Sequence, residues 1–179
     1  MMNYKSGWLT LNRACNLRCK WCYAQSTEYL KEDDLDISLA YQLINIFSEL
    51  NIRHIVLIGG EPTIYPHLFE VIDYCHKMNI RCGIVTNGLK CAEIDFIKKL
   101  KTHDVHSISL SLKGENKEAF QDVTGVNAFD KVKEAVRLLS FGRDKGECLY
   151  GTDREQYRLL FRRYSTNESI GREKISAII

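Results

Sequence analysis

The chain has 179 residues, a formal net charge of +2 at pH 7 and 45% hydrophobic residues. This length suits one domain with a substantial core, and so small a charge excludes strong attraction to nucleic acid or to an anionic membrane surface. No segment reaches the roughly 18 apolar residues of a membrane span, and no apolar signal-peptide core follows the first lysine. The seven cysteines are odd in number, so reduced thiols in a cytoplasmic compartment are expected.

Four strand-like segments alternate along the chain with segments of helical periodicity. The expected strands are residues 8–14, 54–58, 81–85 and 105–112. The expected helices are residues 38–50, a helix opened by Pro66 and continuing through residue 75, and residues 92–101, 116–122 and 129–141. Four successive βα units predict an α/β fold with a parallel sheet, right-handed crossovers and helices on its outer side. The apolar run of the second strand further predicts burial on both of its faces.

Individual residues are expected to fix the ends and faces of these elements. Asp36 or Ser38 is the expected N-cap of the first helix. The apolar side of the third helix is expected to carry Ile94, Ile97 and Leu100. The sequence thus predicts where the first helix begins and which face of the third helix packs on the sheet.

The fourth expected strand has two chemically different faces. Polar side chains alternate along it with aliphatic ones: Ser107, Ser109, Ser111 and Lys113 against Ile108, Leu110 and Leu112. A two-residue period places the two sets on opposite faces. If the aliphatic side chains pack under the helices, the serines face a polar lumen that would suit a polar cofactor. The alternative is an edge strand with one solvated face.

Three cysteines, Cys15, Cys19 and Cys22, lie within eight residues directly after the first strand. Such crowding indicates a shared metal centre, and cysteine thiolates are the usual ligands of a [4Fe–4S] cluster. Three thiolates would hold three irons and leave the fourth open to a small molecule. The alternatives are unrelated thiols or a structural zinc site, which would need a fourth ligand. Cys75 and Cys82 are expected to be buried small hydrophobic residues.

Polar motifs follow the carboxyl end of every expected strand. The cysteines follow the first strand, Gly59-Gly60-Glu61 the second and Thr86-Asn87-Gly88 the third, while Ser111 and Lys113 end the fourth. Because parallel strands point the same way, all four motifs should converge on one rim of the sheet. This rim is where α/β barrels and open α/β sheets place their chemistry.

The C-x3-C-x2-C spacing, with Trp21 before the third cysteine, resembles the radical S-adenosylmethionine (SAM) superfamily. Gly59-Gly60-Glu61-Pro62 resembles that family's GGEP motif, and the resemblance covers residues 8 to about 141. It implies parallel βα repeats that form a partial TIM-like barrel, with residues 1–142 as the core. It also implies that the three cysteines bind a [4Fe–4S] cluster whose fourth iron is chelated by SAM. Reductive cleavage of SAM would then give a 5′-deoxyadenosyl radical that abstracts hydrogen from a substrate.

The resemblance also implies which residues contact SAM. Glu61 would take the methionine ammonium, with two glycines allowing close approach of the backbone. Trp21 would lie against the adenine, although core packing is an equal alternative. Lys113 stands where many members carry an acid, which puts a ribose contact there in doubt. The expected cofactor-binding residues are Trp21, Gly59, Gly60, Glu61, Asn87 and Ser111, and no catalytic residue is assigned.

The βα periodicity stops after Gly142, so residues 143–179 are expected to form an atypical tail. Residues 147–150 could be the stub of a fifth strand, and residues 153–164 have the pattern of a basic amphipathic helix. One hypothesis is a truncated chain, or a reading frame shifted near residues 140–146. The other is a genuine short variant whose basic helix docks a partner.

Three functions remain open on the sequence alone. The first is a radical SAM enzyme acting on a small molecule or peptide, supplied with electrons by a donor such as flavodoxin or ferredoxin, with no nucleic-acid or membrane partner. Residues 120–129 are similar to those of members that modify ribosomally made peptides, and equally to those of cofactor-maturation or activating enzymes. The second is an iron–sulfur electron carrier or sensor. The third is an inactive radical SAM fragment with an unfinished barrel.

Overall fold

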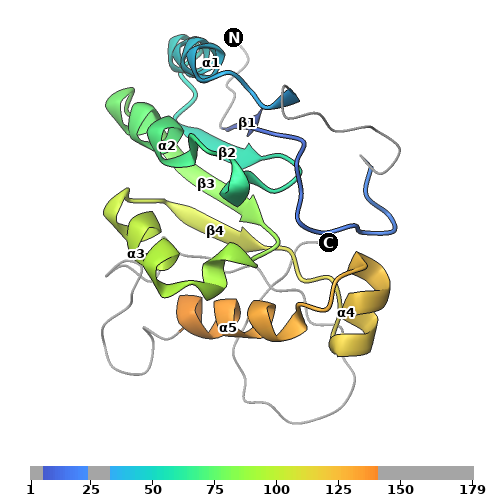
Figure 1. Ribbon diagram of the computed structural model, residues 1–179. Helices are drawn as coiled ribbons and strands as arrows, with labels where there is room; N and C mark the ends of the chain where they lie inside the picture. The colour runs from blue at the N-terminus through green and yellow to red at the C-terminus, as the bar shows by residue number, and fades with distance from the viewer. Residues whose placement is uncertain (1–5, 24–32, 141–179) are drawn as a thin grey trace.

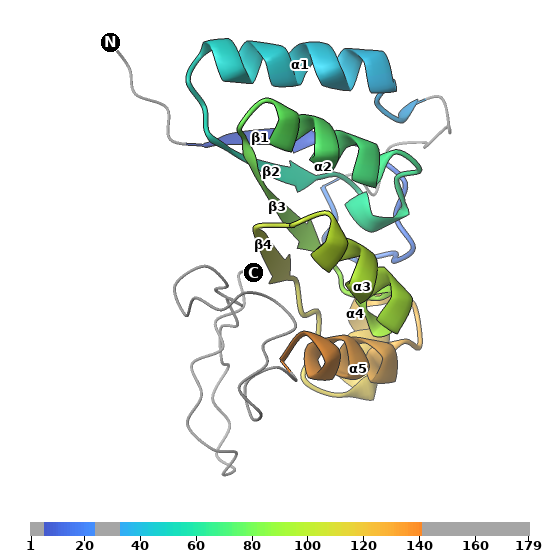
Figure 2. The same cartoon turned by 90° about the vertical axis from the view of Figure 1, so that its left-hand side faces the viewer.

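The computed structural model describes residues 6–23 and 33–140. Its sheet has four parallel strands in the order β1 (Gly7–Thr10), β2 (His54–Ile58), β3 (Arg81–Thr86) and β4 (Ser107–Leu110). The α-helices are α1 (Ile37–Glu49), α2 (Leu68–Lys77), α3 (Ile94–Thr102), α4 (Lys117–Thr124) and α5 (Phe129–Ser140). Helices α1, α2 and α3 lie along one side of the sheet (Figures 1 and 2). The predicted succession of four parallel βα units, a partial TIM-like barrel, is therefore confirmed.

The main core lies between the sheet and these helices. Leu57 and Ile84, from the two central strands, are at most 2% exposed. Cys75 and Cys82 lie in the same core and are each fully buried, which confirms their prediction as small hydrophobic residues. Burial raises the pKa of Cys91, in the short 3-10 helix η3 (Lys90–Ala92), to about 12. These three thiols are thus part of the packing and not of the rim.

The second strand, β2, is fully buried on one face only, which corrects the prediction for it. Its residues alternate between buried positions, Ile55 and Leu57, and half-buried ones, His54, Val56 and Ile58. The helices of the described residues lie on one side of the sheet (Figure 2). An unbroken apolar run therefore does not distinguish here between one covered face and two.

The alternation predicted for the fourth strand is confirmed. Ile108 and Leu110 are buried in the core, whereas Ser107 and Ser109 are half-buried. β4 is also an edge strand of the sheet that the described residues form. The strand ends at Leu110, but the N–H of Ser111 still donates to a carbonyl of β3, so Ser111 continues along the sheet.

The start predicted for α1 is confirmed, whereas the start predicted for α2 is wrong. Asp36 is the N-cap of α1, because its carboxylate accepts hydrogen bonds from the backbone N–H groups of Ser38 and Leu39. Pro66 does not open α2, which begins at Leu68, so that prediction was wrong. Pro66 instead lies in the turn that precedes the helix, where its fixed φ angle is equally well accommodated.

Helix α3 turns a slightly different face to the core than expected. Ile97 and Leu100 are buried as predicted, but Ile94 is 44% exposed and Phe96 is buried in its place. Ile94 is the first residue of the helix, and η3 runs directly before it. Cys91 of η3 and Phe96 of α3 both lie in the main core, whereas the prediction for Ile94 was wrong.

The expectations for the end of the chain concern residues outside the described ranges. They include Gly142, the strand stub at 147–150 and the helix at 153–164, and they remain predictions. The same holds for the proposed boundary between residues 142 and 143. Within residues 6–23 and 33–140, no helix is both long and apolar enough to cross a bilayer.

Candidate functional site

The segment that follows β1, residues 11–23, carries Cys15, Cys19 and Cys22 and is called the cysteine loop. It lies against the end of β2. Figure 1 shows this loop, in blue, on the side of the sheet to which the strand arrows point. The N–H of Gly60 donates to the carbonyl of Asn12 at 2.9 Å. A Cβ on Gly60 would stand 2.3 Å from the carbonyl oxygens of Arg13 and Ala14, and a Cβ on Gly59 would stand 2.3 Å from Asn12 Oδ1. The two glycines are therefore required for the loop backbone to pack directly on this strand end.

Glu61 joins the end of β2 to the end of β3. Its side chain is only 1% exposed. One carboxylate oxygen, Oε1, accepts hydrogen bonds from the hydroxyls of Thr63 at 2.6 Å and Thr86 at 2.7 Å, and from the N–H of Thr63. The other, Oε2, accepts from the N–H of Asn87 at 2.7 Å. A buried carboxylate satisfied in this way is stable without a counter-ion and fixes the geometry of the rim.

The three cysteines, Cys15, Cys19 and Cys22, are free thiols at half-buried positions of one loop. Burial raises the pKa of Cys15 and of Cys19, and the neighbouring thiols raise the pKa of Cys15 further. The positive charge of the Lys113 ammonium acts in the opposite direction and lowers the pKa of Cys19. The sequence placed Lys113 at the end of the fourth strand, and only the structure brings it to the cysteine loop.

The donor set fits a [4Fe–4S] cluster, whose usual ligands are cysteine thiolates. Within the described part of the chain, no three His, Cys, Asp or Glu side chains are arranged around one ion position. A four-iron cube does not need such convergence, because each thiolate binds a different iron. The three free, half-buried thiols are of the chemical type that such a cluster binds, and the charge of Lys113 acts on one of them, Cys19.

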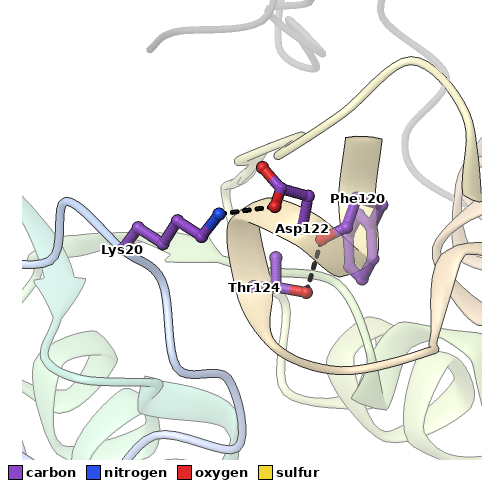
Figure 3. A network of polar contacts seen from close by, with 4 residues as sticks. All are labelled: Lys20, Phe120, Asp122 and Thr124. Carbon is purple, nitrogen blue, oxygen red and sulfur yellow. Dashed lines mark hydrogen bonds and ion pairs between the residues drawn. The ribbon is translucent and has the colours of Figure 1, made fainter. Parts of the chain in front are cut away.

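The cysteine loop also rests on the carboxyl end of α4. The backbone N–H of Arg18 donates to the carbonyl of Thr124 at 2.8 Å, and that of Lys20 donates to the carbonyl of Val123 at 2.9 Å. Figure 3 shows Lys20 reaching Asp122 of the same helix, where they form an ion pair. The last carbonyls of a helix lack intrahelical partners. The N–H groups of the cysteine loop supply partners for those of α4, and the same hydrogen bonds fix the loop against the helix.

Leu17 anchors this contact with an apolar side chain. It is 3% exposed and packs in a small second core with Phe120, Ala128 and Val132. Cys15 and Cys19 pack against the same cluster. The hydroxyl of Thr124 donates to the carbonyl of Phe120 at 2.7 Å (Figure 3), which closes the end of the helix under the loop.

Leu17→Ala is expected to loosen the cysteine loop. Removing a buried leucine side chain costs about 3 kcal/mol of unfolding free energy, and the lost anchor should also speed the release of iron. Urea denaturation and iron retention during dialysis against a chelator would measure the two effects. Asp122→Asn is the control, because it removes an exposed ion pair of the same contact and should change stability much less. Equal effects of the two variants would contradict the anchoring role.

Each residue expected to bind a cofactor has a defined place. Gly59, Gly60, Glu61 and Asn87 lie in the hydrogen-bonded rim, and Ser111 lies next to it, half-buried. Trp21 is 59% exposed, in the cysteine loop. Their contacts with SAM remain predictions.

Several residues of the rim were missed by the sequence analysis. Asn12 Nδ2 donates to the carbonyl of Glu61 at 3.0 Å, and its buried Oδ1 has no hydrogen-bond partner among the described residues. Asn16 accepts a hydrogen bond from the side chain of Asn87. Asn16 directly follows Cys15, which is the one local signal that could have indicated a role.

The fold and the rim define an α/β domain that carries a three-cysteine loop at the carboxyl ends of its parallel strands. The Radical SAM superfamily matches residues 9–141, and the chain belongs to this superfamily of enzymes. Its members use a [4Fe–4S] cluster and SAM, which confirms the cofactor prediction at the level of the family.

Several curated relatives have the printed name "Probable GTP 3′,8-cyclase". The protein from Thermococcus kodakarensis is 29% identical over 136 residues, covering 74% of this chain and 44% of the relative. That from Saccharolobus solfataricus is 31% identical over 135 residues, covering 72% of this chain and 41% of the relative. A match to Saccharolobus islandicus, at 27% identity, covers 95% of this chain and 55% of the relative. The chain thus spans about half the length of these curated relatives.

Solved structures share the fold at lower identity. SuiB from Streptococcus suis, bound to S-adenosylmethionine, superposes with a TM-score of 0.63 at 18% identity and covers 78% of this chain and 32% of that one. The protein anSMEcpe with bound AdoMet gives a TM-score of 0.62 at 22% identity and covers 75% of this chain and 40% of that one. These likenesses support the partial-barrel fold and nothing more specific.

Proposed function

We propose that Cys15, Cys19 and Cys22 each bind one iron of a [4Fe–4S] cluster and leave the fourth iron to SAM. The observation that carries this proposal is the placement of the three thiols on one loop that is hydrogen-bonded to the end of β2 and to α4. When bound and reduced, the cluster supplies the electron that cleaves SAM to a 5′-deoxyadenosyl radical, which abstracts hydrogen from the substrate.

The chain's own residues hold and shield this centre. Lys113 favours the thiolate form of Cys19, which is the form that ligates iron. The second core under Leu17 excludes water from one side of the loop. Contacts of SAM with Gly59, Gly60 and Glu61 remain part of the proposal, as do stacking of its adenine on Trp21 and hydrogen bonds to Asn87 and Ser111.

A purine nucleoside triphosphate is the proposed substrate class. This choice rests on the printed name of the three curated relatives described above, at 27–31% identity. Residues 120–129 are similar to those of peptide-modifying members. Phe120 and Ala128 of this segment pack with Leu17 under the cysteine loop, so a structural role accounts for this similarity without a peptide substrate. A second structure of Streptococcus suis SuiB, bound to its precursor peptide SuiA, superposes with a TM-score of 0.64 at 18% identity and supports the fold alone. A peptide is therefore the second candidate and is tested beside the nucleotide.

The proposal includes a low-potential electron donor of the flavodoxin or ferredoxin type. Reduction of the cluster needs a one-electron reductant. A cytoplasmic location is proposed with it, because the thiols that ligate the cluster must stay reduced.

The test is a SAM-cleavage assay on the full chain after anaerobic reconstitution with iron and sulfide. The reconstituted protein is reduced with dithionite and mixed with SAM, and 5′-deoxyadenosine is measured without substrate, with GTP, with ATP and with a short peptide. We expect 5′-deoxyadenosine to form and its yield to rise with GTP. Formation that GTP does not change would overturn the nucleotide assignment. A cluster without any 5′-deoxyadenosine would favour an electron carrier or an incomplete barrel.

A further inference from the structure

Asn87 lies between the end of β3 and the first cysteine. Its side chain is 7% exposed. The amide Nδ2 donates to Asn16 Oδ1 at 2.7 Å and approaches Cys15 Sγ at 3.9 Å, within the range of hydrogen bonds to sulfur. The amide Oδ1 accepts from the N–H of Leu89 at 3.0 Å. Both ends of the amide are therefore engaged within the protein.

The backbone around Asn87 fixes this orientation. Its N–H donates to the buried carboxylate of Glu61 at 2.7 Å. The Thr86 hydroxyl donates to the same carboxylate and accepts from the N–H of Gly88 at 3.0 Å. Gly88 has φ +84°, a conformation that a side chain would strain, so the turn is held in one form. The Asn87 amide is thus aimed at the cysteine loop by groups from two strands.

A second N–H group is directed at the same sulfur. The backbone N–H of Leu17 donates to Cys15 Sγ at 3.4 Å. Hydrogen bonds to a cluster-bound sulfur withdraw negative charge from it and favour the reduced state, which is the more negative one. Two donors on one thiolate therefore raise the reduction potential of a cluster bound there, relative to a thiolate without them.

We propose that Asn87 is a positioning residue that holds Cys15 through Asn16 and raises the reduction potential of the cluster by donating its amide N–H to Cys15 Sγ. This inference rests on the proposed function, because it requires the cluster. It gives Asn87 a role toward the metal centre beside the SAM contact proposed above. It also gives the buried Glu61 carboxylate a function, because this carboxylate accepts from the N–H of Asn87 and so orients that residue.

The test measures the midpoint potential of the reconstituted cluster by an EPR-monitored redox titration without SAM. Asn87→Ala removes the donor without adding charge, and Asn87→Asp replaces the donor by an acceptor of the same shape. We expect both variants to shift the potential to more negative values. A tenfold change in the reduction equilibrium constant, the size expected for Asn87→Ala, corresponds to ~59 mV for one electron.

Asn16→Asp is the matched control. It places a new carboxylate on the same loop, but its Oδ1 still accepts from Asn87 Nδ2 and the donor to Cys15 is kept. If Asn87→Ala leaves the potential unchanged, or if Asn16→Asp shifts it as much as Asn87→Asp does, the inference is overturned. Iron content measured on the same samples separates the two proposals. A wild-type chain that binds no cluster would overturn the proposed function itself.

Discussion

Replacing Cys15, Cys19 and Cys22 together by alanine is expected to abolish iron binding and 5′-deoxyadenosine formation. The wild-type chain should retain about four irons after anaerobic reconstitution, because the cluster is a cube of four. Without the thiolates, no described side chains on the rim replace them, so the iron content should fall to background. Iron and sulfide analysis, visible absorption and a SAM-cleavage assay on the same samples would measure the loss.

Cys75→Ala provides the matched control for this triple variant. Cys75 is a fully buried thiol of the main core, packed behind the sheet and away from the rim. Its replacement should cost some stability but leave the iron content and the absorption spectrum unchanged. Iron retained by the triple variant, or lost from Cys75→Ala, would mean that the cluster ligands have been assigned to the wrong cysteines.

Gly60→Ala is expected to destabilise the protein and to disturb the cluster site together. The new Cβ would lie 2.3 Å from the carbonyl oxygens of Arg13 and Ala14, which are backbone atoms and cannot rotate away. Either the end of β2 or the segment leading to Cys15 must move. We expect a loss of about 3 kcal/mol in the free energy of unfolding, seen as a lower urea midpoint, and a lower iron content after reconstitution.

Gly125→Ala distinguishes this crowding from the general cost of replacing a glycine. Gly125 ends α4 at φ +70°, and among the described residues its added Cβ would meet Arg18 alone, at 3.5 Å or more. That substitution should cost about 1 kcal/mol, from the backbone conformation alone. If Gly60→Ala were no more destabilising than Gly125→Ala, the close packing of the cysteine loop on β2 would be contradicted.

The glycines of the Gly59-Gly60-Glu61 motif have a structural role beside the SAM contact proposed for them. From the sequence, glycine was expected because a ligand approaches the backbone closely. In the structure, the group that approaches is the protein's own cysteine loop, through Asn12, Arg13 and Ala14. The Glu61 carboxylate likewise has four donors from the chain itself. The motif therefore builds the rim before any cofactor binds.

The sequence by itself determined the order and type of the strands and helices, the parallel sheet and the meeting of its motifs at one rim. It could do so because hydrophobic periodicity is a local property, and because parallel strands necessarily bring their carboxyl ends together. The same local signals misplaced Pro66 at a helix start and Ile94 in the core, since helix ends and helix rotation depend on neighbouring segments.

Only the tertiary structure decided which side chains hold the cysteine loop. Asn87 meets Cys15 across 72 positions of sequence, and Lys20 meets Asp122 across 102. Nothing in the pattern around either partner indicates such a contact, because a hydrogen bond or an ion pair depends on atomic positions that the whole fold sets. The chain thus encodes its three thiols locally, whereas the environment of those thiols arises from segments that fold against them.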